Sequence, residues 1–164
     1  MIQEYQVSGF RVREYEELRS TNTEAERVGW DELEDKMVIL TYKQTQGRGQ
    51  VGNHWESEPG KNISMTVVFK PRELPAGQQF AVSMVIALGA CDFISRYVAG
   101  CTVKWPNDIY VGDRKISGIL IEHSIMGRYV GGSLCGIGVN INQEHFLSDA
   151  PNPVSLFQLI GGKM

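Results

Sequence analysis

A glycine-rich segment between two predicted strands constrains this chain more than any other part of it. Residues 47–52 read Gly-Arg-Gly-Gln-Val-Gly, and apolar, β-prone runs flank them at 37–42 and 62–69. Glycine allows the backbone to adopt positive φ and to approach a ligand closely, and Arg48 offers a planar fork of N–H donors to a carboxylate or phosphate. The segment predicts an anion site, although a mobile surface loop with a solvated arginine explains the same residues equally well.

The spacing of these glycines also matches the dinucleotide-binding fingerprint G-x-G-x-x-G, but the context excludes that motif. The fingerprint requires a helix that begins at the third glycine and holds a pyrophosphate at its N-terminus. Here the residues at 53–60 carry turn signals and no helical period. A P-loop is excluded as well, because the lysine in Gly60-Lys61-Asn62 is not followed by serine or threonine.

The composition describes an ordinary globular chain of one domain. Its 164 residues are 42% hydrophobic and 21% charged, with a formal net charge of −3. This slightly acidic balance argues against a nucleic-acid partner, which would require a basic stripe. Cys91, Cys101 and Cys135 are odd in number, show no zinc spacing and lie on apolar runs, so they are interpreted as buried reduced thiols.

The sequence shows neither a signal peptide nor a membrane span. The N-terminus has no basic region followed by an apolar core. The longest apolar run, at 80–90, is shorter than a membrane span and includes Ser83 and Gly89. Together with the reduced cysteines, these features predict a cytoplasmic protein without a membrane partner.

Strand patterns dominate the chain, with one long helix and no strict βαβ alternation. This predicts an α+β fold with a mixed, largely antiparallel sheet covered by helices. Ser20 or Thr21 is placed to cap the first helix, and Glu24 to complete a capping box. Apolar residues at helical spacing in 78–98 predict that the long helix is buried on the sheet. Strands are expected at 10–15, 37–42, 62–70, 102–105, 109–111, 115–125 and 129–142, and helices at 21–30, 78–98 and from 154 onward.

Four charged side chains stand at the ends of predicted strands: Arg48, Lys104, Asp108 and Lys115. Three cations and a carboxylate near a glycine-lined groove suit phosphoryl or adenylyl transfer, because cations offset the charge that develops on a phosphate and a carboxylate can hold Mg²⁺. Each also has a plainer explanation. Lys104 fits a solvated strand edge, Asp108 an Asx-turn and Lys115 a charged hairpin tip.

Three further features remain open from the residues alone. Trp55 is suited to stacking on a base and equally to a core position. His54 and His123 have no partners at metal-ligand spacing, so packing or surface roles are favoured. The glycines within 129–142 indicate a place where a ligand lies against the backbone of a strand. Composition and spacing therefore predict an anion or nucleotide site of unknown substrate.

Five sequence blocks, spread over about residues 10 to 157, resemble the biotin protein ligases in order and spacing. The blocks are Ser20-Thr21-Asn22, Gln44-x-x-Gly47-Arg48-Gly49-x-x-Gly52-x-x-Trp55, Lys104-Trp105-Pro106-Asn107-Asp108, Lys115-x-x-Gly118-Ile119-Leu120-x-Glu122 and Gly136-x-Gly138-Val139-Asn140. The third and fourth blocks together are the most specific. Lipoate ligases and lipoyl transferases share the lysine but not this combination. The resemblance implies the class II synthetase-like biotin/lipoate ligase fold.

The resemblance also implies a two-step reaction that uses MgATP. Biotin would be activated as biotinyl-5′-AMP with release of pyrophosphate. The ε-amine of a lysine on a biotin carboxyl carrier domain would then attack this mixed anhydride and release AMP. A homodimer is among the assemblies that the resemblance allows. The residues agree with such chemistry, because two anions can be brought together only where cations reduce their repulsion.

Site residues follow from the resemblance, block by block. Lys115, Arg48 and Asp108 would be catalytic, with Asp108 as the ligand of Mg²⁺ or of its waters. The adenylate would contact Arg48, Trp55, Lys104, Asn107, Lys115 and Asn140. Biotin would be bound by Ser20, Thr21, Asn22, Gln44, Gly47, Arg48, Gln50, Lys115, Gly118, Leu120, Gly136 and Gly138. The ureido group needs the paired donors and acceptors of these polar side chains, and the valeryl chain needs a tunnel lined by backbone.

Three departures from the family pattern bear on this interpretation. Gln50 stands where many members have a second arginine, which predicts a weaker grip on the adenylate. Neither a DNA-binding domain nor a C-terminal β-barrel is expected in residues 1–164, and the last helix looks truncated. Residues 1–164 are therefore interpreted as the catalytic domain of a biotin ligase. The alternatives are a lipoate or octanoate ligase or transferase of the same fold, and a biotin-binding fragment without catalysis.

Overall fold

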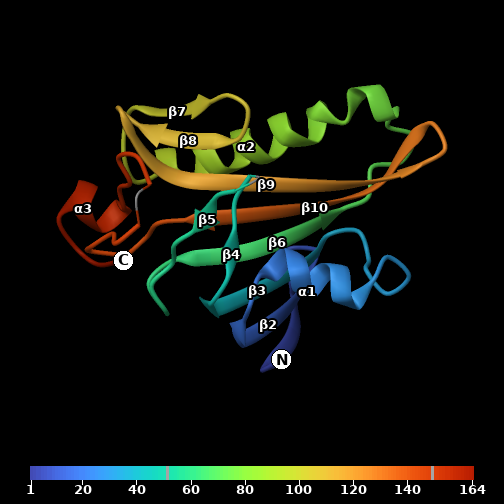
Figure 1. The fold of residues 1–164 in the computed structure, drawn as a ribbon, viewed down its shortest axis with the longest axis horizontal. Coiled ribbons are helices and arrows are strands. Elements are labelled where there is room, and N and C mark those ends of the chain that lie inside the picture. Colours follow the sequence, from blue (N-terminus) through green and yellow to red (C-terminus); the bar gives the residue numbers. More distant parts are fainter. Residues whose placement is uncertain (51, 149) are drawn as a thin grey trace.

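The computed structural model describes residues 1–50, 52–148 and 150–164. Residues 51 and 149 belong to the predicted glycine-rich segment and to the polar loop before the last helix, and lie outside the described residues. Eight strands form one sheet in the order β1-β2-β3-β6-β10-β9-β8-β7 (Figure 1). These strands are β1 (Gln3–Val7), β2 (Phe10–Leu18), β3 (Met37–Gln44), β6 (Ile63–Phe69), β7 (Cys101–Lys104), β8 (Asp108–Val111), β9 (Arg114–Met126) and β10 (Tyr129–Val139).

Neighbouring strands of this sheet are antiparallel, except for β2 and β3, which are parallel. The prediction of a mixed, largely antiparallel sheet is therefore confirmed. The sequence did not indicate β1, whose five residues are all exposed. An edge strand in contact with solvent on both faces has no hydrophobic alternation, which explains why the pattern is missing.

The two faces of the sheet carry different layers. On β6, Ile63, Met65 and Val67 face the apolar core beneath the long helix. The alternate residues point to the other face, where Val68 packs with Ala25 of α1 (Thr21–Val28) in a second core. A short hairpin of β4 (Gly47–Arg48) and β5 (His54–Trp55) stands over this second face. The glycine-rich segment is thus part of a hairpin beside α1, as Figure 1 shows.

Helix α1 begins without the capping box that the sequence predicted. Ser20 occupies the N-cap position, but its side chain makes no capping hydrogen bond. The Glu24 carboxylate accepts two hydrogen bonds from Arg27, at 2.9 and 2.7 Å, and so does not reach back to the N-cap. A complete capping box occurs instead at α3 (Leu156–Ile160), between Ser155 and Gln158.

The long helix α2 (Phe80–Ser95) follows a 3₁₀ turn at Ala76–Gln78 and is less buried than predicted. It packs over β7, β8 and β9 at one end of the sheet, and Ala87 and Ile94 are buried there. By contrast, Met84 and Leu88 are 49% and 63% exposed. The long helix does cover the sheet as predicted, but its apolar pattern is wider than the strip of sheet beneath it, so the prediction that Met84 and Leu88 belong to the core was wrong.

The apolar span at Ala76–Ser95 is also longer than the run considered in the sequence. Within the part of the chain that the structure describes, it is the one helix whose length and composition would allow it to cross a membrane. This is weak evidence for a span, since core helices pass the same test. The residues of α2 that pack on the sheet give this helix a role within the fold.

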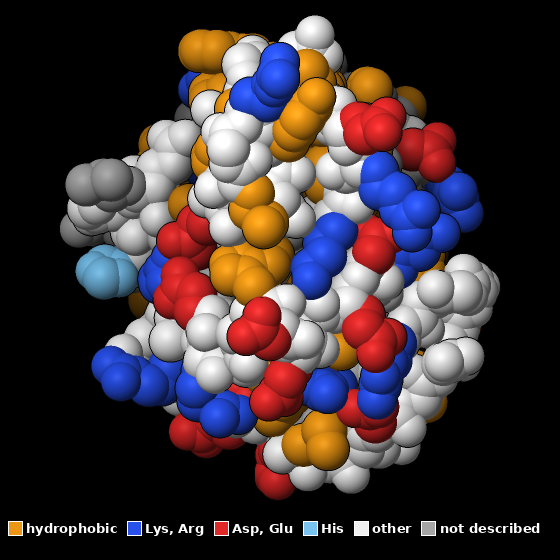
Figure 2. Space-filling model, turned by 90° about the vertical axis from the view of Figure 1, so that its right-hand side faces the viewer, with side chains coloured by type: hydrophobic (Ala, Val, Ile, Leu, Met, Phe, Trp, Pro, Cys, Tyr) orange, Lys and Arg blue, Asp and Glu red, His pale blue; other side chains and the backbone are white. Residues whose placement is uncertain are grey.

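Charged side chains of both signs are mixed on the face that lies to the right in Figure 1. Figure 2 shows lysine and arginine side chains next to aspartate and glutamate over most of this face, with apolar side chains between them. Ion pairs join some of the charged side chains of the protein, for example Arg11 with Glu4 and Glu34. The face drawn there has no single-sign basic stripe of the kind that follows a nucleic-acid backbone.

Candidate functional site

A cavity of about 630 Å³ lies against α1, the β4–β5 hairpin and strands β8 to β10. Its volume is typical of a small-molecule site. Most of the side chains predicted from the sequence line it, although they come from distant parts of the chain. The predicted residues in the lining are Ser20, Thr21, Asn22, Gln44, Arg48, Gln50, Trp55, Asn107, Asp108, Lys115, Gly118, Leu120, Gly136, Gly138 and Asn140.

Two residues predicted for the site are not among those that line the cavity. Gly47 is a buried residue of the hairpin, paired with Trp55, where an added Cβ would lie 2.8 Å from Gln44 Nε2 and collide with the carbonyl oxygen of Trp55. Lys104 is exposed, and its ammonium lies 3.4 Å from Tyr110 Oη and 4.8 Å from the centroid of that ring. The structure therefore does not bring Lys104 together with the other two cations, and its role toward a nucleotide stays a prediction.

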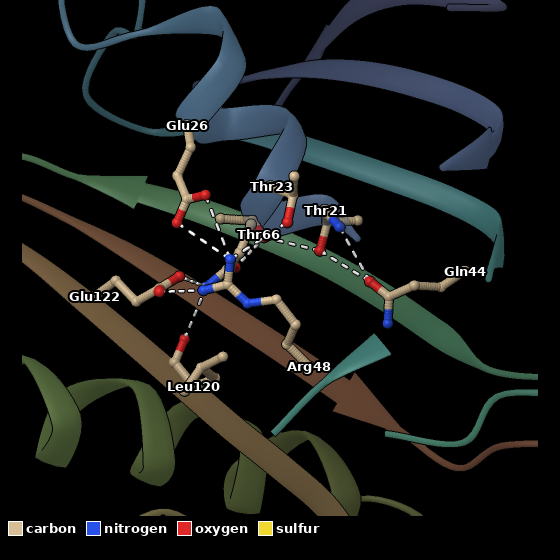
Figure 3. A network of polar contacts seen from close by, with 9 residues as sticks. Thr21, Thr23, Glu26, Gln44, Arg48, Thr66, Leu120 and Glu122 are labelled. Atoms are coloured by element: carbon tan, nitrogen blue, oxygen red, sulfur yellow. Dashed lines mark hydrogen bonds and ion pairs between the residues drawn. The ribbon is translucent and has the colours of Figure 1, made fainter. Parts of the chain in front are cut away.

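One end of the cavity is built from a chain of hydrogen bonds between buried and half-buried polar side chains (Figure 3). Gln44 Oε1 accepts from the Thr21 backbone N–H at 3.0 Å. Thr66 Oγ1 lies 2.8 Å from Thr21 Oγ1 and 2.5 Å from Asn22 Oδ1. The Asn22 amide then donates to Glu122 Oε2 at 2.8 Å. Such a connected network holds its members in one orientation, because each would leave a buried partner unsatisfied if it turned away.

Arg48 belongs to the same network rather than to the opposite end of the cavity. Its guanidinium forms an ion pair with Glu122 and a second pair with Glu26 at 3.2 Å, and donates to Thr23 Oγ1 at 3.3 Å. Burial works against the positive charge, but the two carboxylates outweigh it and raise the pKa of Arg48. The guanidinium is thus held by protein carboxylates, and an anionic ligand would have to compete with them.

Trp55 occupies the middle of the cavity. Its indole lies against β9 and β10, where an added Cβ at Gly118 would be 2.8 Å from the ring and one at Gly138 would collide with it. Trp55 Nε1 is buried and has no hydrogen-bond partner among the described residues. Gly136 likewise makes room for Asn22, whose Oδ1 would be 2.5 Å from an added Cβ. These glycines accommodate side chains of the chain itself and also line the cavity, so the prediction that a ligand lies against this backbone stays a prediction.

The other end of the cavity holds a lysine–carboxylate pair. Lys115 Nζ is 2.7 Å from Asp108 Oδ1, across the pairing of β8 with β9. Asn107 donates to the Ile119 carbonyl at 2.7 Å, which fixes the turn before β8. Asn140 donates to the Val154 carbonyl, while its Oδ1 is buried and lacks a partner within the described part of the chain.

A magnesium ion fits this end only together with a nucleotide. Asp108 supplies one carboxylate, and the described residues contain no group of three or more His, Cys, Asp or Glu side chains that could hold a metal. Mg²⁺ is commonly bound through one or two carboxylates plus phosphate oxygens and waters, which agrees with such a site. The assignment of Asp108 as a metal ligand stays a prediction.

Sequence reasoning missed a contact that joins the hairpin to the loop before α3. The Glu56 carboxylate, next to Trp55, accepts hydrogen bonds from the backbone N–H groups of Leu147 at 2.9 Å and Ser148 at 2.8 Å, and from Gln143 Nε2 at 2.9 Å. Burial would raise the pKa of Glu56, but these hydrogen bonds outweigh it and hold the pKa below its ordinary value. No local signal marks Glu56, because its partners lie about ninety residues away.

The comparisons with known proteins agree with this geometry. The model of the Biotin/lipoate A/B protein ligase family matches residues 15–140. The chain belongs to this family. The matched range includes α1, the β4–β5 hairpin, the Lys115–Asp108 pair and most of strands β9 and β10. It therefore covers every wall of the cavity except the loop after β10.

Two relatives in the family illustrate the degree of similarity. The chain is 28% identical to the bifunctional ligase/repressor BirA of Bacillus subtilis over 165 residues, which is 97% of this chain and 50% of the relative. It is 34% identical to the biotin–[acetyl-CoA-carboxylase] ligase of Paracoccus denitrificans over 74% of this chain and 51% of the relative. The chain thus spans about half the length of the curated relatives it matches.

Solved structures of the family share the fold. A biotin protein ligase from Aquifex aeolicus, in complex with biotin and ATP, aligns over 93% of this chain and 62% of that chain, with a TM-score of 0.76 and 24% identity. A biotin acetyl coenzyme A carboxylase synthetase from Helicobacter pylori, with bound biotinylated ATP, aligns over 92% and 70%, with a TM-score of 0.61 and 27% identity. The expected biotin/lipoate ligase fold is therefore confirmed.

Proposed function

We propose that residues 1–164 form a catalytic domain that activates biotin with ATP as biotinyl-5′-AMP and transfers it to a lysine of a biotin carboxyl carrier domain. One observation carries the proposal, namely the order of three kinds of side chain along β9 and β10. The hydrogen-bonding network around Asn22 lies at one end, the Trp55 ring packs on Gly118 and Gly138 in between, and the Lys115–Asp108 pair lies at the other end.

The order follows from the strand register. Leu120 pairs with Gly136 beside Asn22, and Gly118 pairs with Gly138 beneath Trp55. Lys115 lies further along the same line, near the N-terminal end of β9. At about 3.4 Å per residue, Leu120 and Lys115 are about 17 Å apart along the strand. A ligand that fits this order has a polar head with donors and acceptors, an apolar middle and an anionic tail. Biotin has these three parts in its ureido group, its thiophane ring with the valeryl chain, and its carboxylate.

The first half-reaction requires two anions to meet at the Lys115 end. The carboxylate oxygen of biotin attacks the α-phosphorus of ATP, and pyrophosphate leaves. The Lys115 ammonium would offset the repulsion between the two reactants and the charge that develops on the phosphate oxygens. Asp108 keeps this ammonium in place and, together with the nucleotide phosphates, would hold Mg²⁺, which supplies further charge neutralisation when bound.

In the second half-reaction the ε-amine of the carrier lysine attacks the carbonyl carbon of the mixed anhydride, and AMP leaves. The carrier domain belongs to this proposal, in keeping with the name of the relative from Paracoccus denitrificans, a biotin–[acetyl-CoA-carboxylase] ligase. A cytoplasmic location is part of the proposal as well. Sedimentation of the purified chain would test the homodimer that the family resemblance allows.

Pyrophosphate release from MgATP tests the proposal, with biotin, with lipoate and with neither present. We expect release with biotin alone. Release with lipoate alone would move the assignment to the lipoate branch of the family. Biotin binding measured by calorimetry, without pyrophosphate release, would leave a binding domain that lacks catalysis.

A further inference from the structure

Thr66 lies at the centre of the network in Figure 3, although it belongs to none of the five sequence blocks. Its side chain is fully buried on β6. We infer that Thr66 is a positioning residue that fixes the Thr21 hydroxyl as a hydrogen-bond acceptor toward the cavity, so that the site selects a head group with an N–H donor. This inference deepens the proposed function and rests on it.

The first step is the orientation of the Asn22 amide. One end of this amide lies 2.8 Å from Glu122 Oε2 and 3.3 Å from the Leu120 carbonyl oxygen. A carboxylate and a carbonyl only accept hydrogen bonds, so the amide nitrogen must face them. Its oxygen therefore faces Thr66 Oγ1, at 2.5 Å.

The second step is a count of hydroxyl hydrogens. Thr66 has one hydroxyl hydrogen and two close oxygen neighbours, Asn22 Oδ1 at 2.5 Å and Thr21 Oγ1 at 2.8 Å. Because the amide oxygen of Asn22 can only accept, it takes the Thr66 hydrogen. The short contact between the two threonines is then satisfied when the Thr21 hydroxyl donates to Thr66, which at 2.8 Å is much nearer than its other acceptor, Gln44 Oε1 at 3.5 Å. The remaining lone pairs of Thr21 Oγ1 are left to accept from a ligand in the cavity that this residue lines.

The surroundings of Thr66 keep this arrangement rigid. Thr66 pairs with Ile39 of β3 on one side and with Gly136 of β10 on the other, in the interior of the sheet. Gly136 has no side chain, and Asn22 fills that space next to Thr66. Thr21 and Asn22 are themselves 4% and 3% exposed, so water has little access to compete for their hydrogen bonds.

The consequence is a chemical filter on the head of the ligand. A cyclic urea carries N–H groups that can donate to a fixed acceptor. A dithiolane ring or a plain alkyl chain has no such donor and would leave the acceptor lone pairs of Thr21 Oγ1 buried without a partner. Sites built to hydrogen-bond a polar group reject analogues that lack it far more strongly than apolar pockets reject analogues of slightly different size.

The first test compares Thr66→Val with Thr66→Ser. Valine keeps the shape and removes the hydroxyl, whereas serine keeps the hydroxyl. We expect Thr66→Val to weaken biotin binding in calorimetry by about tenfold or more, with the KM for ATP unchanged, and Thr66→Ser to bind biotin as the parent does. Thr41→Val is the matched control, because Thr41 is also a buried threonine, on the neighbouring strand β3, but does not line the cavity.

The second test needs no mutation. Biotin methylated at one or the other ureido nitrogen lacks one N–H donor, and we expect one of the two isomers to bind the parent protein weakly. That isomer should lose little further affinity in Thr66→Val, since both changes act on the hydrogen bond from the ureido N–H to Thr21 Oγ1. The inference is overturned if Thr66→Val binds biotin as tightly as the parent, or if both methylated isomers bind like biotin.

These outcomes differ from a failure of the proposed function. If the parent protein binds biotin and releases pyrophosphate while Thr66→Val is unchanged, only the role of Thr66 is refuted. If the parent protein prefers lipoate over biotin, the proposed function fails, and the filter for an N–H donor fails with it.

Discussion

Lys115 and Asp108 form an ion pair of 2.7 Å between adjacent strands, and both side chains line the cavity. About three-quarters of each side chain is buried. A partly buried pair of this kind holds the ammonium in a fixed place. The ammonium can still attract a further anionic group. The pair is therefore suited to receive two negatively charged reactants.

The first prediction concerns the ammonium itself. Lys115→Ala should reduce the rate of biotinyl-adenylate formation by more than tenfold, because a cation placed at developing charge commonly contributes several kcal/mol to transition-state stabilisation. The measurement is single-turnover pyrophosphate release at saturating MgATP and biotin. Lys43→Ala is the matched control, since Lys43 also forms a 2.7 Å ion pair, with Glu17, but does not line the cavity. Near-normal turnover of the Lys115 variant would remove this residue from the mechanism.

The second prediction concerns retention of the adenylate by Arg48. Its guanidinium lines the polar end of the cavity and is held there by Glu122 and Glu26. Arg48→Ala should let biotinyl-5′-AMP leave the protein at least about tenfold faster, because it frees Glu122, which orients Asn22 at the polar end of the cavity. A charge-assisted hydrogen bond of this kind contributes about 1.5–3 kcal/mol. Displacement of prebound adenylate by excess biotin gives this rate.

Arg96→Ala serves as the control for Arg48, since Arg96 also pairs with a carboxylate, Asp92, but lies at the C-terminal end of α2 and does not line the cavity. A variant of Arg48 that releases the adenylate no faster than the parent would contradict the role proposed for it.

The sequence predicted those parts of the fold and site that depend on local patterns. The strand expected at 115–125 is β9, and most residues of the five blocks do line one cavity. The parts that it missed depend on distant contacts. Thr66 looks like any β-prone strand residue until the fold brings it to Asn22, 44 positions away. The exposed side of α2 was missed for a different reason. An apolar helical period predicts which residues are apolar but not how much of the sheet is available to cover them.

The third prediction concerns two cysteines that the sequence analysis interpreted as buried reduced thiols. Cys91 of α2 and Cys101 of β7 are free and half-buried, with their sulfur atoms 2.8 Å apart. Glutathione disulfide should convert them to an intramolecular disulfide with release of two glutathione thiols. Burial and the hydrogen bond with Cys91 raise the pKa of Cys101, so Cys91 should form the first mixed disulfide.

Mass spectrometry of the oxidised protein should show the loss of two hydrogens and no glutathione adduct. Cys135→Ser should behave in the same way, because Cys135 is buried in the sheet with a raised pKa of about 12. The prediction fails if the parent protein accumulates a stable glutathione adduct, or if Cys91→Ser still forms an internal disulfide.

The fourth prediction concerns the pH dependence of the contact between Glu56 and the loop at Leu147 and Ser148. Hydrogen bonds from this loop lower the pKa of Glu56 in the folded state, despite the opposing effect of burial. A carboxylate with a lowered folded-state pKa stabilises the protein above its unfolded-state pKa, and this stability is lost as the pH falls through the folded-state value. Glu56→Gln should therefore lower the free energy of unfolding by about 1 kcal/mol at about pH 7, and the difference should shrink toward zero at about pH 3.

Urea unfolding of the parent protein and of Glu56→Gln at the two pH values measures this difference. Glu58→Gln is the control, because the neighbouring carboxylate of Glu58 forms only a long 4.0 Å ion pair with Lys61. Glutamine keeps the shape of Glu56 but loses the negative charge that two backbone N–H groups and Gln143 share. A stability difference that stays constant from neutral to acidic pH would mean that the charge of Glu56 does not hold the loop.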